Sequence, residues 1–251
     1  VVRNKGMLGQ LIQQIGGVTP PEPTTSAPLT NAKGPGFIQR MTDFMQPMEG
    51  RVEVRVANFN DDADGIVTKK VIAAFDRFRD VHARPLGRAL EINVDEDLTT
   101  ELSRAAKLAR HWLAERQADI LIWGHVPPAG SPVHIHFISL ATWDEWIPGG
   151  FDLTTDLPLP AHLSGPYADF LHAATLSATV PASRDKTKMR LAALPDAAVM
   201  AGVAMDDIPP DMTSRERAAL YLCHGNIPTS AWSAKRAPEY MAQAMAAYRQ
   251  V

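Results

Sequence analysis

The feature that most constrains this fold is the nearly continuous apolar run Asp119–Val126 (DILIWGHV). It has the length of a strand but lacks the alternation of apolar and polar residues that marks a strand with one solvent-exposed face. We therefore expect a strand that is buried on both faces. Arg51–Phe59 alternates apolar and polar residues, which predicts a second strand with one buried face. Together these segments indicate a sheet with helices packed on it.

Helical spacing separates the predicted strands. Residues 66–78 carry apolar side chains three or four positions apart, and residues 98–117 follow three acidic residues that suit the positive end of a helix dipole. The predicted order is a strand at 51–59, a helix at 66–78, extended segments at 81–86 and 88–94, a helix at 98–117, strands at 119–126 and 133–138, and a further strand near 151–155. This order predicts an α/β (α+β) fold with a small mixed sheet and two packed helices.

The composition changes after residue 160. Of the 36 alanines, 21 follow residue 150, and alanine is the strongest helix former. Several prolines punctuate this half of the chain, so we expect an all-α region of short helices. The predicted helices lie at about 165–179, 184–193, 195–204, 213–225 and 234–250.

The N-terminal residues have the composition of a linker. Five prolines lie between Gly16 and Pro35 among Thr, Ser, Ala and Gly, which favours an extended segment that orders only when bound. A short helix is predicted at 37–45. We therefore expect an N-terminal arm at 1–45, an α/β domain at 46–157 and a helical region at 158–251. Because the first residue is Val, we expect a processed, trimmed or partial chain.

The predicted α/β domain resembles the small N-terminal domain of TolB-like periplasmic proteins and of CsgG-like lipoproteins. The resemblance rests on a first strand ending in Asn58-Phe59, on alanines in the second helix, and on Ala118–Val126 followed by a Pro/Gly turn. It covers about a third of the chain. The resemblance implies a bacterial interaction or assembly module, and it carries over no catalytic residue.

The C-terminal segment resembles one tetratricopeptide-type helical pair. Gly225-Asn226 would end its first helix, and Ala244, Ala247, Tyr248 and Arg249 would form the packed face of the second. The usual Trp-x-x-Leu-Gly opening is absent, and solenoids need about three repeats for stability. The resemblance implies a surface that binds peptides or other proteins.

Overall charge and composition exclude several classes of protein. The net charge is −3, which argues against a strongly basic nucleic-acid surface. No stretch approaches 18 apolar residues, so we expect no membrane span in this chain. A single cysteine, Cys223, excludes a disulfide scaffold and a Cys-rich zinc site. One cysteine fits the cytoplasm and the periplasm equally, and association with a membrane through a partner or an upstream segment stays open.

Asn60–Gly65 (NDDADG) fits the first half of a calcium loop. Asn60, Asp62 and Asp64 would supply oxygen ligands, but position twelve is Val71 where a bidentate Glu is required. The alternative is a strand-to-helix turn with Asp64 near the helix N-cap. Asp62 and Asp64 are therefore kept as candidate binding residues.

Three histidines are candidate ligands for a metal ion. His134 and His136 lie two apart on a predicted strand and point to one face, and His125 lies on the neighbouring strand. We expect no metal there, since a half-exposed strand face explains the pattern. No catalytic motif is present: Cys223 and His224 are adjacent on a predicted helix and point about 100° apart. We expect no catalytic residue and no cofactor.

Trp143 and Trp146 lie in an acidic, Gly-terminated loop that could recognise a partner, since Trp is enriched in binding hot spots. We expect a non-catalytic interaction or assembly subunit whose partners are other proteins in a larger complex or further copies of the chain. Two alternatives stay open. One is a sensory or regulatory domain of a membrane protein, and the other is a small-molecule or metal-binding domain with its site at the strand ends near 60–65 and 124–130.

Overall fold

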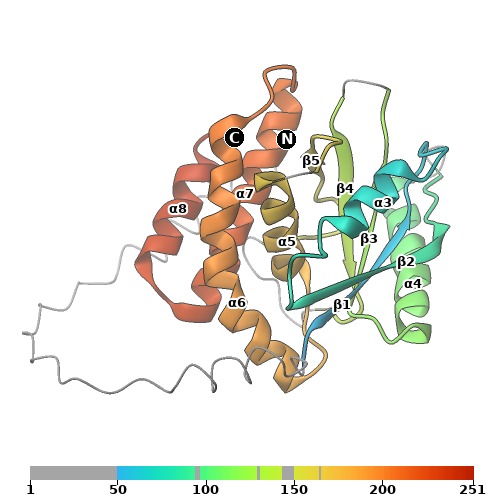
Figure 1. Ribbon diagram of the computed structural model, residues 1–251, viewed down its shortest axis with the longest axis horizontal. Helices are drawn as coiled ribbons and strands as arrows, with labels where there is room; N and C mark the ends of the chain where they lie inside the picture. The colour runs from blue at the N-terminus through green and yellow to red at the C-terminus, as the bar shows by residue number, and fades with distance from the viewer. Residues whose placement is uncertain (1–49, 94–96, 129–130, 143–149, 164) are drawn as a thin grey trace, which may run out of the picture. The chain divides into compact units, whose positions relative to one another are not determined.

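The computed structural model describes residues 50–93, 97–128, 131–142, 150–163 and 165–251. The described residues all belong to one compact unit. It contains a mixed five-stranded sheet followed by a helical C-terminal region (Figure 1), which confirms the predicted fold class. The predicted arm, the helix at 37–45, and the candidate residues Trp143 and Trp146 lie outside the described residues.

The elements have the following bounds. The strands are β1 (Val52–Asn58), β2 (Val81–Ala89), β3 (Ile120–His125), β4 (Val133–Ser139) and β5 (Leu157–Leu159). The helices are α3 (Ile66–Ala73), α4 (Leu98–Glu115), α5 (Pro166–Ala178), α6 (Arg184–Val203), the short 3₁₀ helix η1 (Ala204–Asp207), α7 (Ser214–Lys235) and α8 (Pro238–Tyr248). None of these described helices is both long enough and apolar enough to cross a membrane.

The strand order in the sheet is β2-β1-β3-β4-β5. β1 runs parallel to β2 and β3, while β4 runs antiparallel to both β3 and β5. The helices α3 and α4 follow β1 and β2, as parallel neighbours require a crossover connection. β3 lies at the centre with every residue from Ile120 to Gly124 buried, which confirms a strand buried on both faces.

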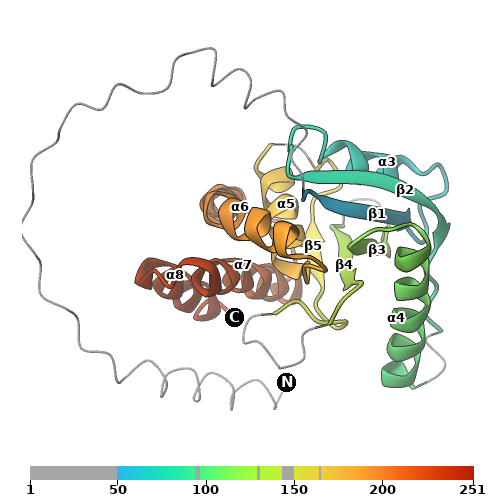
Figure 2. The same cartoon turned by 90° about the horizontal axis from the view of Figure 1, so that it is seen from below.

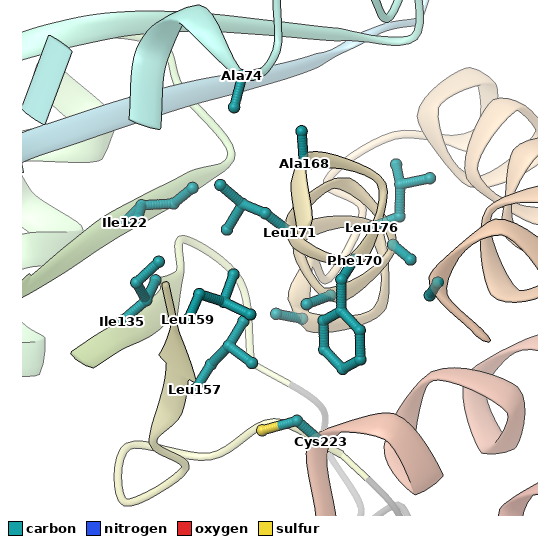
Figure 3. Close-up of a cluster of buried hydrophobic side chains, with 14 of the residues drawn as sticks. Ala74, Ile122, Ile135, Leu157, Leu159, Ala168, Phe170, Leu171, Leu176 and Cys223 are labelled. Carbon is teal, nitrogen blue, oxygen red and sulfur yellow. The ribbon is translucent and has the colours of Figure 1, made fainter. Parts of the chain in front are cut away.

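The sheet is covered on both faces (Figure 2). On one face, Ile122, Ile135, Leu157 and Leu159 meet Phe170 and Leu171 of α5 (Figure 3), while α7 contacts both α5 and β5. On the other face, Leu121 and Trp123 pack against α4 through Ala109 and Leu113. The sheet and the C-terminal helices therefore share one hydrophobic core, and β5 spans the position 157/158 at which we placed a boundary.

Two helices run through positions at which we expected a break. α6 is a single helix across Pro195, and α7 continues past Gly225-Asn226 and Pro228 to Lys235, so the predicted breaks there are wrong. A proline inside a helix costs about 3 kcal/mol. Both prolines and most of their neighbours are buried, so tertiary packing outweighs this cost.

Three smaller expectations also differ. The segment at 81–86 and the start of the segment at 88–94 form one strand, β2, which passes through Gly87 (φ of 75°) where the β1–β2 register shifts and ends at Ala89. Residues 90–93 lie outside the strand. The helix that begins at Ile66 ends at Ala73, short of residue 78. The last strand is Leu157–Leu159, since Asp152 and Thr155 close a turn at 152–155 instead.

Candidate functional site

Asp62 holds the first turn of α3. Its carboxylate accepts hydrogen bonds from the backbone N–H groups of Val67 (3.2 Å) and Thr68 (2.8 Å) and from the Thr68 hydroxyl (2.8 Å). Burial alone would raise the pKa of Asp62, but these donors hold it below its ordinary value. Thr68 is buried and its Oγ1 also accepts the N–H of Phe59, so Asp62 joins the end of β1 to the start of α3.

The other two candidate residues of the calcium loop, Asn60 and Asp64, have different contacts. Asn60 donates its side-chain amide to the Leu90 carbonyl and bridges His125 through its backbone. Asp64 is exposed, and its backbone carbonyl accepts from Lys69. Gly65, with a φ of 61°, is the N-cap residue of α3, so the capping carboxylate is Asp62 and not Asp64. Within the described ranges, no group of three or more His, Cys, Asp or Glu side chains is placed to hold a metal ion.

The three predicted histidines do come together. The ring of His125 stacks on that of His134 (centroids 4.6 Å apart), and Trp123 stacks on His136 (4.6 Å). These are cross-strand neighbours in the β3–β4 register. Gly124, between the two aromatic residues of β3, has no room for a Cβ atom, which would meet the His134 carbonyl and the Phe59 ring. Glycine there lets the two strands approach.

Asp156 and Glu216 complete a histidine cluster, which we define as His125, His134, His136, Asp156 and Glu216. The Nδ1 of His134 lies 2.8 Å from Oδ2 of Asp156, and its Nε2 lies 3.8 Å from Oε1 of Glu216 in the first turn of α7. His136 donates Nδ1–H to the Thr155 carbonyl (3.0 Å). The cluster therefore joins β3, β4, the residue before β5 and α7.

The histidine cluster holds protons unevenly. The hydrogen bond to Asp156 raises the pKa of His134, whereas burial lowers the pKa of His136. Burial alone would raise the pKa of Asp156, but the His134 hydrogen bond and the nearby imidazoles hold it below its ordinary value. Oδ1 of Asp156 is buried without a hydrogen bond, 3.9 Å from Nε2 of His136. The arrangement favours the protonated form of His134 and links the sheet to α7.

Cys223 has the character of a core residue. It is fully buried against α5 and β5, and burial raises the pKa of its thiol far above the ordinary value (Figure 3). A thiol in this state is a poor nucleophile, because the thiolate is the reactive form. Its Sγ lies 3.4 Å from the Asp156 carbonyl, to which it can donate.

The outer face of α6 carries exposed apolar side chains. Val199, Met200 and Val203 are 59%, 48% and 46% exposed. Six large apolar side chains are exposed among the described residues, and these three share one helix face. We define the α6 face as Lys188, Ala192, Asp196, Val199, Met200 and Val203, which are all exposed and lie three or four positions apart, apart from the adjacent pair 199–200.

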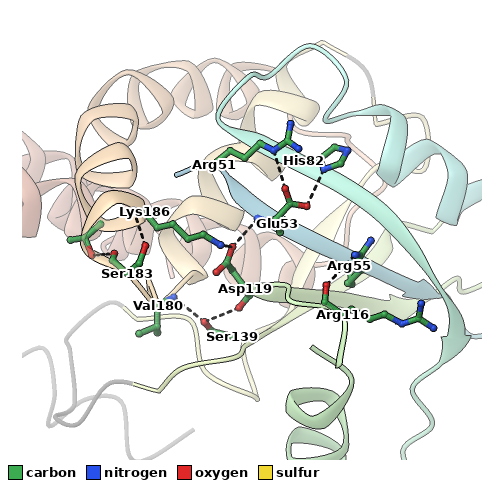
Figure 4. Close-up of polar contacts among 11 residues, drawn as sticks. Arg51, Glu53, Arg55, His82, Arg116, Asp119, Ser139, Val180, Ser183 and Lys186 are labelled. Atoms are coloured by element: carbon green, nitrogen blue, oxygen red, sulfur yellow. Dashed lines mark hydrogen bonds and ion pairs between the residues drawn. The ribbon is translucent and has the colours of Figure 1, made fainter. Parts of the chain in front are cut away.

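The N-terminal end of α6 is fixed to the sheet. Lys186 pairs with Asp119 at the start of β3, and the backbone N–H of Val180 donates to the Ser139 hydroxyl (Figure 4). Ser183 caps the helix by accepting the N–H of Lys186. The α6 face is therefore presented by a helix that the rest of the fold holds in place.

A shallow cavity of about 290 Å³ lies between α4 and the turn at 152–155. Its lining combines Leu102, Ala106 and Leu153 with the cationic Lys107 and Arg110. This volume is at the lower end of the range for small-molecule sites.

Sequence reasoning missed the α6 face and the two acids of the histidine cluster. The spacing of Val199 and Val203 gives an apolar pair on one helix face, but it does not tell which face packs on α5 and α7. Asp156 and Glu216 lie 20 and 80 residues from His136, so no local signal connects them. Comparison of the chain with protein-family models, with curated proteins and with solved structures finds no match.

Proposed function

We propose that this chain is a non-catalytic subunit that associates with other proteins through the α6 face. The observation that carries the proposal is the gathering of Val199, Met200 and Val203 on one exposed helix face. Single exposed apolar residues are normal on a protein surface, whereas a cluster of them marks a site of interaction.

The architecture supports this function. α6 packs on α5 and α7, and its buried residues include Leu194, Ala197 and Ala201. Its exposed apolar side chains therefore take no part in the internal core. The helix is held at its start by the ion pair between Lys186 and the buried Asp119. A rigid helix presenting an apolar face loses little conformational entropy on binding, which favours association.

The candidate reactive groups have structural tasks, which also supports a non-catalytic role. Cys223 is buried as a thiol, and Asp62 satisfies the N-terminus of α3. His134 forms a dyad with Asp156, and its second ring nitrogen faces the acid Glu216, where a nucleophile would be required.

The test compares variants of the full chain expressed at native level in its source organism. Val199→Ser combined with Val203→Ser removes the α6 face, and Ile66→Ser, which changes another exposed apolar residue, on α3, is the matched control (51% exposed). We expect the wild type and the control to purify in a complex of defined mass, and the α6 variant to lose it without a change in Tm. A wild-type chain that purifies alone, or a complex that survives the α6 substitutions, would overturn the proposal.

A further inference from the structure

We infer that the α6 face binds a second copy of this chain, with the two α6 helices antiparallel and Lys188 of each copy beside Asp207 of the other. This inference rests on the proposed function and names its partner. The basis is the distribution of charge along α6 and η1, which makes the surface complementary to itself when it is turned end to end.

The two ends of this surface carry opposite charge. Arg184 and Lys188 are exposed near the start of α6, and the side chain of Lys188 is 67% exposed with a weak contact to Asp185 at 3.9 Å. Asp206 and Asp207 are exposed in η1, directly after α6. In a parallel pair, like charges would meet at both ends. In an antiparallel pair, opposite charges meet at both ends, and the two helix dipoles also oppose.

One register pairs the charges at both ends and gives Val203 an apolar partner. When Lys188 lies opposite Asp207, Ala192 lies opposite Val203, because each pair of residue numbers has the same midpoint. Lys188 and Asp207 are about 30 Å apart, at about 1.5 Å per residue along α6 and about 2.0 Å per residue along η1, so a two-fold axis near the centre places one charge pair at each end. The small Ala192 gives Val203 of the other copy a recess to fill.

This register also brings like charges together near the two-fold axis, which weakens the dimer. Asp196 lies opposite Val199, close to the two-fold axis, so the carboxylates of both copies are brought near one another. A helix pair about 30 Å long and about 10 Å wide is smaller than a standard stable interface. The dimer is therefore weak, with a dissociation constant of about 10–100 μM.

The first experiment measures the mass of the full chain by sedimentation and light scattering between about 5 and 500 μM. We expect the mass to rise from 27.4 kDa toward twice that value. The double variant Val199→Ser and Val203→Ser should stay monomeric, while Ile66→Ser should dimerise like the wild type. A wild-type mass that stays at 27.4 kDa, or a dimer that persists in the double variant, overturns the inference.

Charge reversal tests the register. Lys188→Glu or Asp207→Lys alone should weaken the dimer about three- to tenfold, since two symmetric ion pairs are lost. Combining the two substitutions should restore it. Asp196→Ser should strengthen the dimer, because it removes two like charges near the axis. A double variant as weak as the single ones contradicts the antiparallel register.

Cross-linking locates the contact directly. Chains carrying Ala192→Cys and chains carrying Val203→Cys are mixed and oxidised; Cys223 is buried and does not compete. The mixture should form disulfide dimers faster than either variant alone, since a disulfide needs Cα atoms within about 7 Å. Equal rates overturn the register. A monomeric chain whose α6 variants still lose a heterologous complex would overturn the inference and leave the proposed function standing.

Discussion

Lys186 Nζ lies 2.6 Å from Oδ2 of Asp119, and the same carboxylate oxygen accepts the backbone N–H of Glu53 at 2.8 Å. Asp119 is 3% exposed at the start of the central strand, and Lys186 comes from the first turn of α6 (Figure 4). A buried carboxylate is tolerated only when it is paired and hydrogen-bonded. This pair therefore ties the helix that carries the proposed interface to the centre of the sheet.

Replacing Lys186 by Met should destabilise the chain by about 2–4 kcal/mol, because it leaves the Asp119 carboxylate buried without its cation. Asp119→Asn in the same chain should recover a large part of this loss, since an amide oxygen can still accept the Glu53 N–H. Urea unfolding at low micromolar concentration measures both values. Lys107→Met, which changes an exposed lysine, is the control and should shift the free energy of unfolding by less than about 0.5 kcal/mol. Additive effects of the Lys186 and Asp119 substitutions would contradict the coupling.

Asp62→Ala should lower the free energy of unfolding by about 1–2 kcal/mol, because two backbone N–H groups of α3 and the Thr68 hydroxyl lose their acceptor. The pKa of Asp62 is lowered on folding, so its contribution is present above the unfolded pKa and is lost as pH falls through the folded one. Chemical unfolding at pH 7 and at pH 2.5 should therefore show a smaller effect at the acidic pH.

Asp64→Ala is the matched control for Asp62, because its side chain is exposed in the same turn. It should change stability by less than about 0.5 kcal/mol. The same pair of variants tests the calcium-loop hypothesis: if residues 60–65 bind Ca²⁺, added Ca²⁺ should raise the Tm of the wild type and should fail to do so in both variants. An equal loss of stability in the two variants would contradict the capping role of Asp62.

The elements that the sequence predicted well are those whose signal is local. β3 has almost no polar position, and Asp97 caps the N-terminus of α4 through the Thr100 N–H, as acidic residues before a helix indicate. α7 was divided incorrectly because Gly225 and Pro228 are local helix breakers. What holds them in the helix is distant: Tyr248 donates to Asn226, and Asn226 donates to the Gly150 carbonyl.

The candidate site shows the same division. That His134 and His136 share a face with His125 follows from strand alternation and pairing, and these three rings do lie together. Asp156 joins them because the last strand, β5, begins directly after it. The sequence predicted this strand near 151–155 and so did not place Asp156 beside the histidines. The α6 face could not be identified either, because the stripe becomes a surface only when the packing of α5 and α7 on the opposite side of α6 is known.

His134→Gln should destabilise the chain more at acidic pH than at alkaline pH. The folded pKa of His134 is raised above its unfolded value, mainly by the hydrogen bond to Asp156, so its stabilisation is fully present below about pH 6.5 and is lost as pH rises through the folded pKa. Glu216 adds to this effect, and Arg215 opposes it. Urea unfolding between pH 5.5 and 8.5 should show the difference between wild type and variant shrinking with pH.

His136→Gln is the companion measurement, because its pKa shift has the opposite sign. Burial lowers the pKa of His136, so its neutral form is favoured on folding, and the wild type loses stability as pH falls below about 6.5 through the folded pKa. The free energy of unfolding of the wild type should therefore fall relative to that of the variant as the solution is acidified. Parallel pH profiles for the two variants would contradict the uneven distribution of protons in the histidine cluster.

Gly225→Ala should destabilise α7 although alanine is the better helix former. An added Cβ would lie 2.6 Å from Cδ1 and 2.8 Å from Cζ of the Tyr248 ring, and it would also meet Cε1. The ring has little freedom to move, because its hydroxyl donates to Asn226 and lies 3.2 Å from Oγ1 of Thr229. The clash should exceed the gain in propensity of about 1 kcal/mol and leave a net loss of about 1–3 kcal/mol.

Gly202→Ala, on α6, is the control, because nothing lies within 4 Å of its added Cβ. It should stabilise the chain by about 0.5–1 kcal/mol, the usual gain on replacing a helical glycine. In a chain that already carries Tyr248→Ala, the substitution Gly225→Ala should lose its penalty and approach the effect at Gly202. Thermal and urea unfolding of the four chains measure the coupling between positions 225 and 248. If Gly225→Ala stabilised the wild-type chain as Gly202→Ala does, the close packing of α8 on α7 through Tyr248 would be refuted.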